Sequence, residues 1–154
     1  MLILLLAGCS GRGAHGLPVP PPTDFAQFSR SAAPHTALAA PVGFMPAPDL
    51  VTPLYQVPAA RLYGAIRAVA AGRARTFLQI AYDDRLQAHF VVRSALQNFP
   101  DLVSVQVLPQ GAASSTLIVF STSVYGSYDF GVNRRRVRRW LEALNAALAQ
   151  TSGS

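Results

Sequence analysis

The uneven distribution of proline is the feature that most constrains how this chain can fold. Ten of its twelve prolines lie between Pro18 and Pro58, in a chain of 154 residues. Proline has no backbone N–H and its ring clashes with the preceding helical turn, so a long helix is excluded from this region. We therefore expect the compact part to come mainly from the residues after Pro58, and about a hundred residues are enough for one core.

The first ten residues, MLILLLAGCS, form an apolar run that ends in Leu6-Ala7-Gly8-Cys9. This ending resembles the lipobox of bacterial lipoproteins, in which a signal is removed before a cysteine that is then acylated. The resemblance implies a signal over residues 1–8, a lipid such as palmitate on Cys9, and a location at the periplasmic face of the bacterial cell envelope. Ser10 stands where aspartate would imply inner-membrane retention, so the resemblance favours the outer membrane.

The start of the chain departs from a full signal peptide. Only eight residues precede Cys9 and none of them is basic, whereas signal peptides begin with a basic segment. The lipoprotein interpretation therefore expects a true start further upstream. The alternative is a trimmed or coincidental hydrophobic start, and the run is too short to span a bilayer as a helix.

The Pro-rich region divides into two expected segments. Residues 9–23 are rich in glycine and then in proline, which is typical of a flexible tether that does not pack. Residues 24–57 contain too many apolar side chains for a free linker, among them Phe25 and Phe44. We expect them to form an extended strap that lies against a compact domain over residues 58–150.

The hydrophobic pattern after Pro58 predicts a helix over residues 58–71 and a second helix over residues 131–149. Between them, alternating apolar and polar residues predict four strands, over residues 75–82, 86–95, 102–108 and 116–125. Turn-forming residues separate these strands and favour antiparallel neighbours. The predicted fold class is α+β: a two-layer sandwich in the order helix, four antiparallel strands, helix, with both helices on one face.

All thirteen basic residues are arginine, and the net charge is +6. Five of them lie in the predicted last helix: Arg134, Arg135, Arg136, Arg138 and Arg139. Helical projection places Arg135, Arg138 and Arg139 on the solvent side. Because guanidinium groups match phosphate and carboxylate, these residues form a candidate anion-binding surface. The alternative is a solvated helix face in a protein whose genome encodes arginine in place of lysine.

Small and polar residues precede the last helix at defined spacing: Ser121, Ser123, Gly126, Asp129, Gly131 and Asn133. Asp129 is suited to accept hydrogen bonds from the first free N–H groups of the helix. Asn133 is expected to point inward, where it must be hydrogen-bonded. The favoured interpretation is that Asp129 and Asn133 fix the loop to the helix. The alternative is an anion site formed by helix N–H groups with Arg134 or Arg136.

The order Ser-x-Ser, Gly-x-x-Asp-x-Gly-x-Asn and then basic residues resembles the signature of a bacterial family, the domain-of-unknown-function family numbered fourteen ninety-nine. Phe99-Pro100-Asp101 resembles the central Phe-x-Asp region of that family, and the resemblance covers about residues 45–149. Val124 stands where members often have arginine. The resemblance implies no particular activity.

These features favour a non-catalytic binding or structural module of the cell envelope. Its expected partners are the membrane, through a lipid on Cys9, and an anionic lipid, a cell-wall acid or an acidic protein at the arginine-rich face. Nucleic acid is not expected, because few aromatic residues accompany the arginines and the location is extracytoplasmic. One cysteine and three scattered histidines give no metal site, and no cofactor is expected.

Two alternatives to this function stay open. The first is a hydrolase-like enzyme that uses Ser121 or Ser123 with Asp129 and an arginine. The second is a subunit that binds a partner through its sheet face or its strap.

Overall fold

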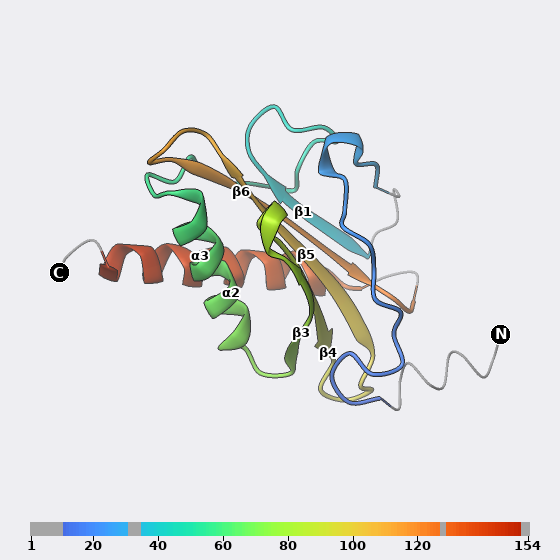
Figure 1. Cartoon of the computed structure of the whole chain (residues 1–154). Helices are drawn as coiled ribbons and strands as arrows, with labels where there is room; N and C mark the ends of the chain where they lie inside the picture. Colours follow the sequence, from blue (N-terminus) through green and yellow to red (C-terminus); the bar gives the residue numbers. More distant parts are fainter. Residues whose placement is uncertain (1–10, 31–34, 127–128, 152–154) are drawn as a thin grey trace.

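The computed structural model describes residues 11–30, 35–126 and 129–151, in which two helices pack on a single sheet (Figure 1). The helices are α2 (Ala59–Ala71) and α3 (Val132–Thr151), each starting one residue after its predicted start. Within the described part of the chain, neither helix has both the length and the apolar character needed to cross a membrane. The strands are β1 (Thr36–Ala40), β2 (Leu50–Val51), β3 (Thr76–Tyr82), β4 (Gln87–Arg93), β5 (Pro100–Pro109) and β6 (Ser115–Ser123).

The sheet has the strand order β2-β1-β6-β5-β4-β3. Strands β3 to β6 are antiparallel neighbours in sequence order, as predicted, with Phe90 opposite Val103 and Val103 opposite Ser121. The α+β class is therefore correct, but the prediction of four antiparallel strands is wrong. The sheet has six strands and is mixed, because β1 runs antiparallel to β6 and parallel to β2.

The two additional strands come from the Pro-rich segment that was expected to be an extended strap. Prolines at positions 34 and 41 leave a proline-free stretch that is long enough for β1. Leu38 on β1 is fully buried and lies opposite Phe120 on β6. Three of the five residues of β1 are alanine, which has a low preference for strands. The alanine-rich stretch therefore lacks the alternation of large apolar and polar residues that predicts a strand.

Both helices cover the same face of the sheet (Figure 1), so the main core lies between the two layers. Leu62 and Ile66 of α2 are fully buried there. From α3, Trp140 packs perpendicular to Phe90 of β4, with ring centroids 5.7 Å apart. This contact joins the first half of α3 to the sheet, and Asn133 at the start of the helix bonds to Ser123 at the end of β6.

The N-terminal segment covers the opposite face of the sheet. Phe25, Leu38 and Ile118 are buried in a second, smaller core on that side. The N-terminal segment follows the sheet in the view of Figure 1, where it is drawn in blue.

Residues 11–23, the described part of the expected tether, also contact the sheet. The Gln87 side chain exchanges two hydrogen bonds with the backbone of Thr23, at 2.7 and 2.8 Å. The hydroxyl of Tyr82 donates to the carbonyl of Pro20 at 2.7 Å. The expectation that this segment does not pack is therefore corrected, because polar side chains of the sheet satisfy its backbone.

Candidate functional site

Asp129 accepts hydrogen bonds from the start of α3. Its Oδ1 accepts from the amide of Gly131 and its Oδ2 from the amide of Asn133, both at 2.8 Å. The first N–H groups of a helix have no partner within the helix, so a carboxylate in this position stabilises its first turn. Gly131 has a φ of +74°, a left-handed conformation that glycine adopts without strain. Asp129 thus has the structural role that its sequence position favours.

Asn133 is fully buried beneath this loop. Its Nδ2 group donates to Asp129 Oδ2 at 2.8 Å and to Ser123 Oγ and the carbonyl of His35 at 2.9 Å. One amide nitrogen has two hydrogens, so three acceptors share them. The Ser121 hydroxyl donates to the Oδ1 of Asn133. The side chain therefore joins the helix, the end of β6 and the residue before β1.

Arg136 belongs to the same buried network. Its Nη1 donates to Asn133 Oδ1 and, at 3.0 Å, to Ser121 Oγ, while its Nη2 donates to the carboxylate of Asp101 on β5. The side chains of Arg136 and Asp101 are only 12% and 10% exposed. Arg136 is thus directed into the protein and already binds an internal carboxylate.

This geometry does not prepare either serine for hydrolysis. Ser121 is fully buried and its hydroxyl proton is directed to Asn133. Among the residues that the structure describes, no hydrogen bond joins Ser121 or Ser123 to a histidine ring that would act as a base. The network holds the loop against the helix rather than activating a hydroxyl.

The other arginines of α3 are exposed. Arg134 donates to the backbone carbonyl of Asp49 at 3.3 Å, on the β1 side of the helix. Burial alone would raise the pKa of Asp49, but hydrogen bonds from Arg30 and the Leu38 amide, with the nearby charges of Arg30 and Arg134, hold it below its ordinary value. Arg135 donates to the carbonyl of Phe130 at 2.8 Å.

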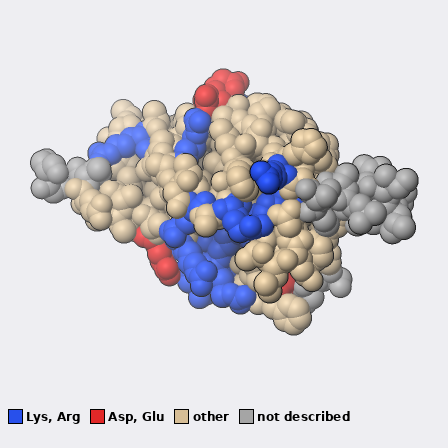
Figure 2. Space-filling model, turned by 90° about the horizontal axis from the view of Figure 1, so that it is seen from below, with Lys and Arg blue, Asp and Glu red and all other residues tan. Residues whose placement is uncertain are grey.

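A hollow of about 450 Å³ lies between the first half of α3 and the starting end of β3. We call it the arginine-lined hollow. Arg135, Arg136 and Arg139 line it, whereas Arg134 and Arg138 do not. Figure 2 shows how the basic side chains gather near the middle of this side of the molecule. The hollow is lined by Arg73, Ala74, Thr76, Val92, Val132, Arg135, Arg136, Arg139 and Trp140.

Arg73 is the arginine of this hollow that the sequence did not indicate. It follows the end of α2, and its Nη2 donates to the carbonyl of Arg139 at 3.3 Å across 66 residues of sequence. Arg73 and Arg139 meet only because α2 packs against α3, so no local sequence pattern predicts their contact. Within the described residues, the ion pairs involve none of Arg73, Arg135 and Arg139, and no acidic side chain lines the hollow.

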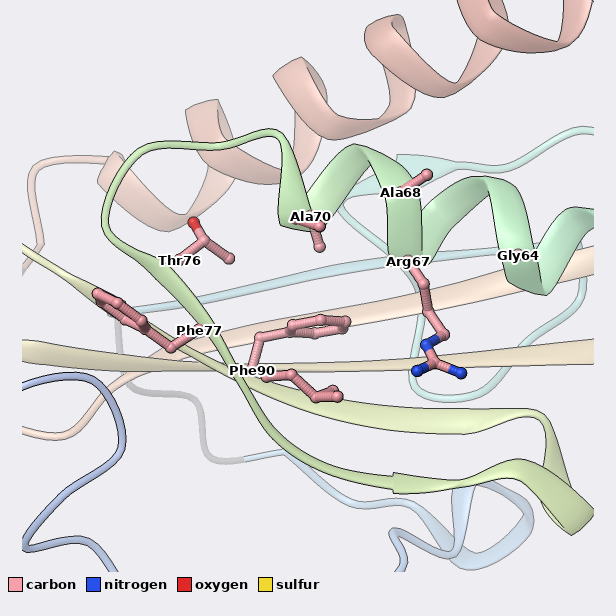
Figure 3. A pocket seen from close by; sticks show the side chains of 9 residues that line it. Gly64, Arg67, Ala68, Ala70, Thr76, Phe77 and Phe90 are labelled. Atoms are coloured by element: carbon pink, nitrogen blue, oxygen red, sulfur yellow. The ribbon is translucent and has the colours of Figure 1, made fainter.

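A larger cavity of about 660 Å³ lies between α2 and the edge strand β3 (Figure 3). We call it the α2–β3 groove. Leu78 of β3 lines it and is 47% exposed, whereas the side chain of Phe77 faces the other side of the sheet, beside Gly13. In Figure 3 Phe90 lies in the middle of the groove and Arg67 toward one end. Thr76 lines both the groove and the arginine-lined hollow. The complete lining is Gly64, Arg67, Ala68, Ala70, Ala71, Thr76, Phe77, Leu78 and Phe90.

Cys9 and Gly126 are two further residues that the sequence singled out. The candidate lipidation site, Cys9, lies outside the described residues. Gly126 has a φ of +90°, so the turn after β6 uses the backbone freedom of glycine. Within the described residues, no group of three or more His, Cys, Asp or Glu side chains is arranged to hold a metal ion.

Residues 20–144 match the model of a family described as "Protein of unknown function (DUF1499)". A search of the curated proteins finds no significant match. The chain is similar to a solved structure of the di-domain ARO/CYC BexL from the BE-7585A biosynthetic pathway, with a TM-score of 0.50 and 13% identity. That match covers 67% of this chain but only 46% of BexL, and at this identity the likeness concerns the fold alone.

Two further solved structures are similar at lower scores. A Thermobifida fusca protein has a TM-score of 0.41 and 10% identity, with 65% of this chain and 78% of that chain covered. A Thermus thermophilus protein has a TM-score of 0.36 and 13% identity, with 73% of this chain and 98% of that chain covered.

Proposed function

The chain belongs to the DUF1499 family of proteins of unknown function, and we propose that it is a non-catalytic binding module that holds an anionic group in the arginine-lined hollow. One observation carries this proposal. Arg73, Arg135 and Arg139 surround one hollow that no acidic side chain lines. Arg136 lies beside them, but its charge is already matched by Asp101.

The charge arrangement supports an anionic occupant. Three guanidinium groups around one small volume repel each other, and Arg135 in the first turn of α3 also opposes the helix dipole. A phosphate or carboxylate in the hollow would offset both effects. Arginine is the side chain best suited to hold such a group with two parallel hydrogen bonds.

The size and lining of the hollow support a small group rather than a broad surface contact. Its volume of about 450 Å³ falls within the usual range of ligand sites, about 300–1,000 Å³. Val92 and Trp140 form apolar parts of the lining. The proposed ligand class is therefore a phosphate or carboxylate group, such as the head group of a lipid, a cell-wall acid or an acidic side chain of a partner protein.

Titration calorimetry with inorganic phosphate at low salt tests the site. The full chain carries Cys9→Ala throughout, so that a bound lipid does not interfere. Arg135→Gln with Arg139→Gln is expected to weaken phosphate binding by more than about tenfold, because each charge-assisted hydrogen bond contributes about 1.5–3 kcal/mol.

The matched control is Arg134→Gln with Arg138→Gln. It removes the same charge from the same helix, and one of its arginines likewise bonds to a backbone carbonyl, but neither residue lines the hollow. Phosphate affinity should change little in this variant. If both double variants lose the same phosphate affinity, the binding depends on general surface charge and not on the hollow. Unchanged phosphate affinity in both would also refute the site.

We also propose that a lipid on Cys9 anchors the module at the periplasmic face of the cell envelope. The run Leu6-Ala7-Gly8-Cys9 supports this. Cys9→Ala is expected to abolish palmitate labelling and to move the protein from the membrane fraction to the soluble fraction of expressing cells. Ser10→Asp, which retains the cysteine, should keep the label and shift the protein from the outer to the inner membrane. Unchanged membrane association of Cys9→Ala would contradict the anchor.

A further inference from the structure

We infer that the ligand is an anionic amphiphile, with its phosphate-like head in the arginine-lined hollow and its apolar chain in the α2–β3 groove. This inference rests on the proposed function, because it uses the same hollow for the head group. It adds a second site, the groove, and it narrows the ligand class to single lipid-like molecules that have one charged end.

The hollow and the groove adjoin each other at the α2–β3 connection. Thr76, the first residue of β3, lines both. On the α2 side, Ala71 lines the groove, while Arg73 and Ala74 line the hollow. A molecule that passes along Thr76 therefore meets arginines on one side and apolar side chains on the other.

The groove has the properties of a site for a hydrocarbon chain. Leu78 and Phe90 supply its largest apolar side chains, and small residues line the α2 side. Phe77, which precedes Leu78 on the strand, faces the other side of the sheet, where its ring lies beside Gly13. Leu78 is 47% exposed. Exposed apolar surface within a groove is unfavourable in water and is typical of a binding site. An alkyl chain over Leu78 and the alanines of α2 would remove their surface from water, which favours binding in proportion to the area covered.

Arg67 is the one charged residue that lines the groove, and its charge already has partners. It donates to Asp83 at 3.1 Å, and its guanidinium carbon lies 5.3 Å from the ring centroid of Tyr63. Strong positive charge is therefore concentrated at the hollow and not within the groove. This asymmetry is complementary to a molecule with one anionic end, and it favours neither a neutral hydrocarbon nor a polyanion.

The experiment compares decyl phosphate, below its aggregation concentration, with inorganic phosphate, by calorimetry on the full chain carrying Cys9→Ala. Decyl phosphate is expected to bind at least tenfold more tightly, since each CH₂ group that is buried tightens binding by about fourfold. Shortening the chain to hexyl phosphate should weaken binding stepwise toward the value for phosphate.

Ala71→Phe places a large side chain at an exposed position that lines the groove. It should remove most of the advantage of decyl phosphate and leave phosphate affinity unchanged. The matched control is Ala60→Phe, an exposed position on the same helix that lines neither cavity, and it should leave both affinities unchanged. Leu78→Ser should also remove most of the advantage of decyl phosphate, because it replaces apolar surface of the groove with a small polar side chain and does not fill the groove.

The outcomes separate the two proposals. If phosphate binds through Arg135 and Arg139 but decyl phosphate binds no more tightly, the amphiphile inference is wrong and the anion site stands. If phosphate does not bind, both proposals fail. Tight binding of decyl phosphate that survives Arg135→Gln with Arg139→Gln would show a purely apolar site and overturn the inference. Binding to phosphatidylglycerol vesicles without tighter binding of decyl phosphate would show a bilayer-facing surface and would also overturn it.

Discussion

Arg136 on α3 and Asp101 on β5 form a nearly buried ion pair across 35 residues of sequence. The pair joins the two segments that carry the family resemblance, Phe99-Pro100-Asp101 and the C-terminal motif, whose last part, Asn133 and the basic residues after it, lies in α3. Arg136 also donates to Asn133 and Ser121, so the central aspartate and the C-terminal motif meet in one hydrogen-bonded network. These residues hold the start of α3 on the sheet, and the start of α3 forms one wall of the arginine-lined hollow.

Asp101→Ala should strongly destabilise the protein, because it leaves the Arg136 guanidinium buried without a carboxylate. Removal of one partner from a buried pair costs about 3–5 kcal/mol, and urea denaturation measures this loss. In contrast, Arg67→Gln breaks the exposed pair with Asp83, whose side chains are 36% and 68% exposed, and should cost less than about 1 kcal/mol. Similar losses in the two variants would contradict the structural role of the buried pair.

Helical periodicity predicted part of this arrangement and missed another part. Projection indicated that Asn133 faces inward and that Arg135 faces solvent, and their burial agrees. Arg136 was grouped with the candidate anion-binding residues, yet it faces the sheet and bonds to Asp101. The reason is that a helical projection places Arg136 at the margin of the apolar stripe, where only a partner on a distant strand determines its direction.

Asp129→Ala should destabilise the protein by about 1–2 kcal/mol, the usual cost of losing a side chain that caps a helix. The variant leaves the amides of Gly131 and Asn133 without the carboxylate that accepts from them. Thermal and urea unfolding measure the change. Asp84→Ala is a suitable control, since Asp84 is an exposed residue of a short 3₁₀ turn, and it should change stability by less than about 0.5 kcal/mol. A loss for Asp129→Ala no larger than this would refute the capping role.

Strand β1 and the position of Arg73 show what the sequence pattern could not reveal. The four predicted strands have clear apolar alternation or turn residues at their ends, whereas β1 is a short alanine-rich stretch between prolines. It forms a strand because β6 offers it an unpaired edge, with Leu38 opposite Phe120. Arg73 joins the hollow only through the contact of α2 with α3. Both features depend on tertiary contacts that leave no local signature.

Tyr55 and Tyr63 are buried to a similar extent, but within the described residues only the Tyr63 hydroxyl has hydrogen-bond partners. Burial raises the pKa of each phenol to about 12, and for Tyr63 the neighbouring Asp83 raises it as well. The Tyr63 hydroxyl lies 2.9 Å from both Asp83 Oδ1 and the carbonyl of Gln87. Within the described residues, the Tyr55 hydroxyl is buried and has no hydrogen-bond partner.

Removal of each hydroxyl should therefore have different effects on stability. Tyr63→Phe is expected to cost about 1–2 kcal/mol, because it removes a hydrogen bond to a charged group. Tyr55→Phe should be neutral or stabilising by up to about 1 kcal/mol, because it removes a polar group that is buried without a partner. The two variants delete the same atom, so the difference between their urea midpoints measures the hydrogen bonding alone. Equal midpoints would contradict this account.

His89 on β4 forms a buried polar network on the face of the sheet that the N-terminal segment covers. Its Nδ1 lies 2.9 Å from the Ser104 hydroxyl, and its Nε2 lies 3.2 Å from Oε1 of Gln87. The same Gln87 oxygen accepts a hydrogen bond from the amide of Thr23, so the network connects the histidine to the covering segment. Burial lowers the pKa of His89 below its ordinary value of 6.5.

This shift predicts that the folded protein loses stability as the pH falls below about 6.5. In that range the unfolded chain binds a proton at His89 and the folded protein does not, so acidification favours unfolding. Urea midpoints at pH 7.5 and pH 5.5 should therefore differ in the parent chain and differ much less in His89→Gln. His15→Gln is the control, because His15 is exposed and its replacement should leave the pH dependence intact. The pKa of Asp49 is held below 3.8, so this carboxylate contributes only at lower pH. A slope between pH 7.5 and pH 5.5 that persists in His89→Gln would refute the assignment to His89.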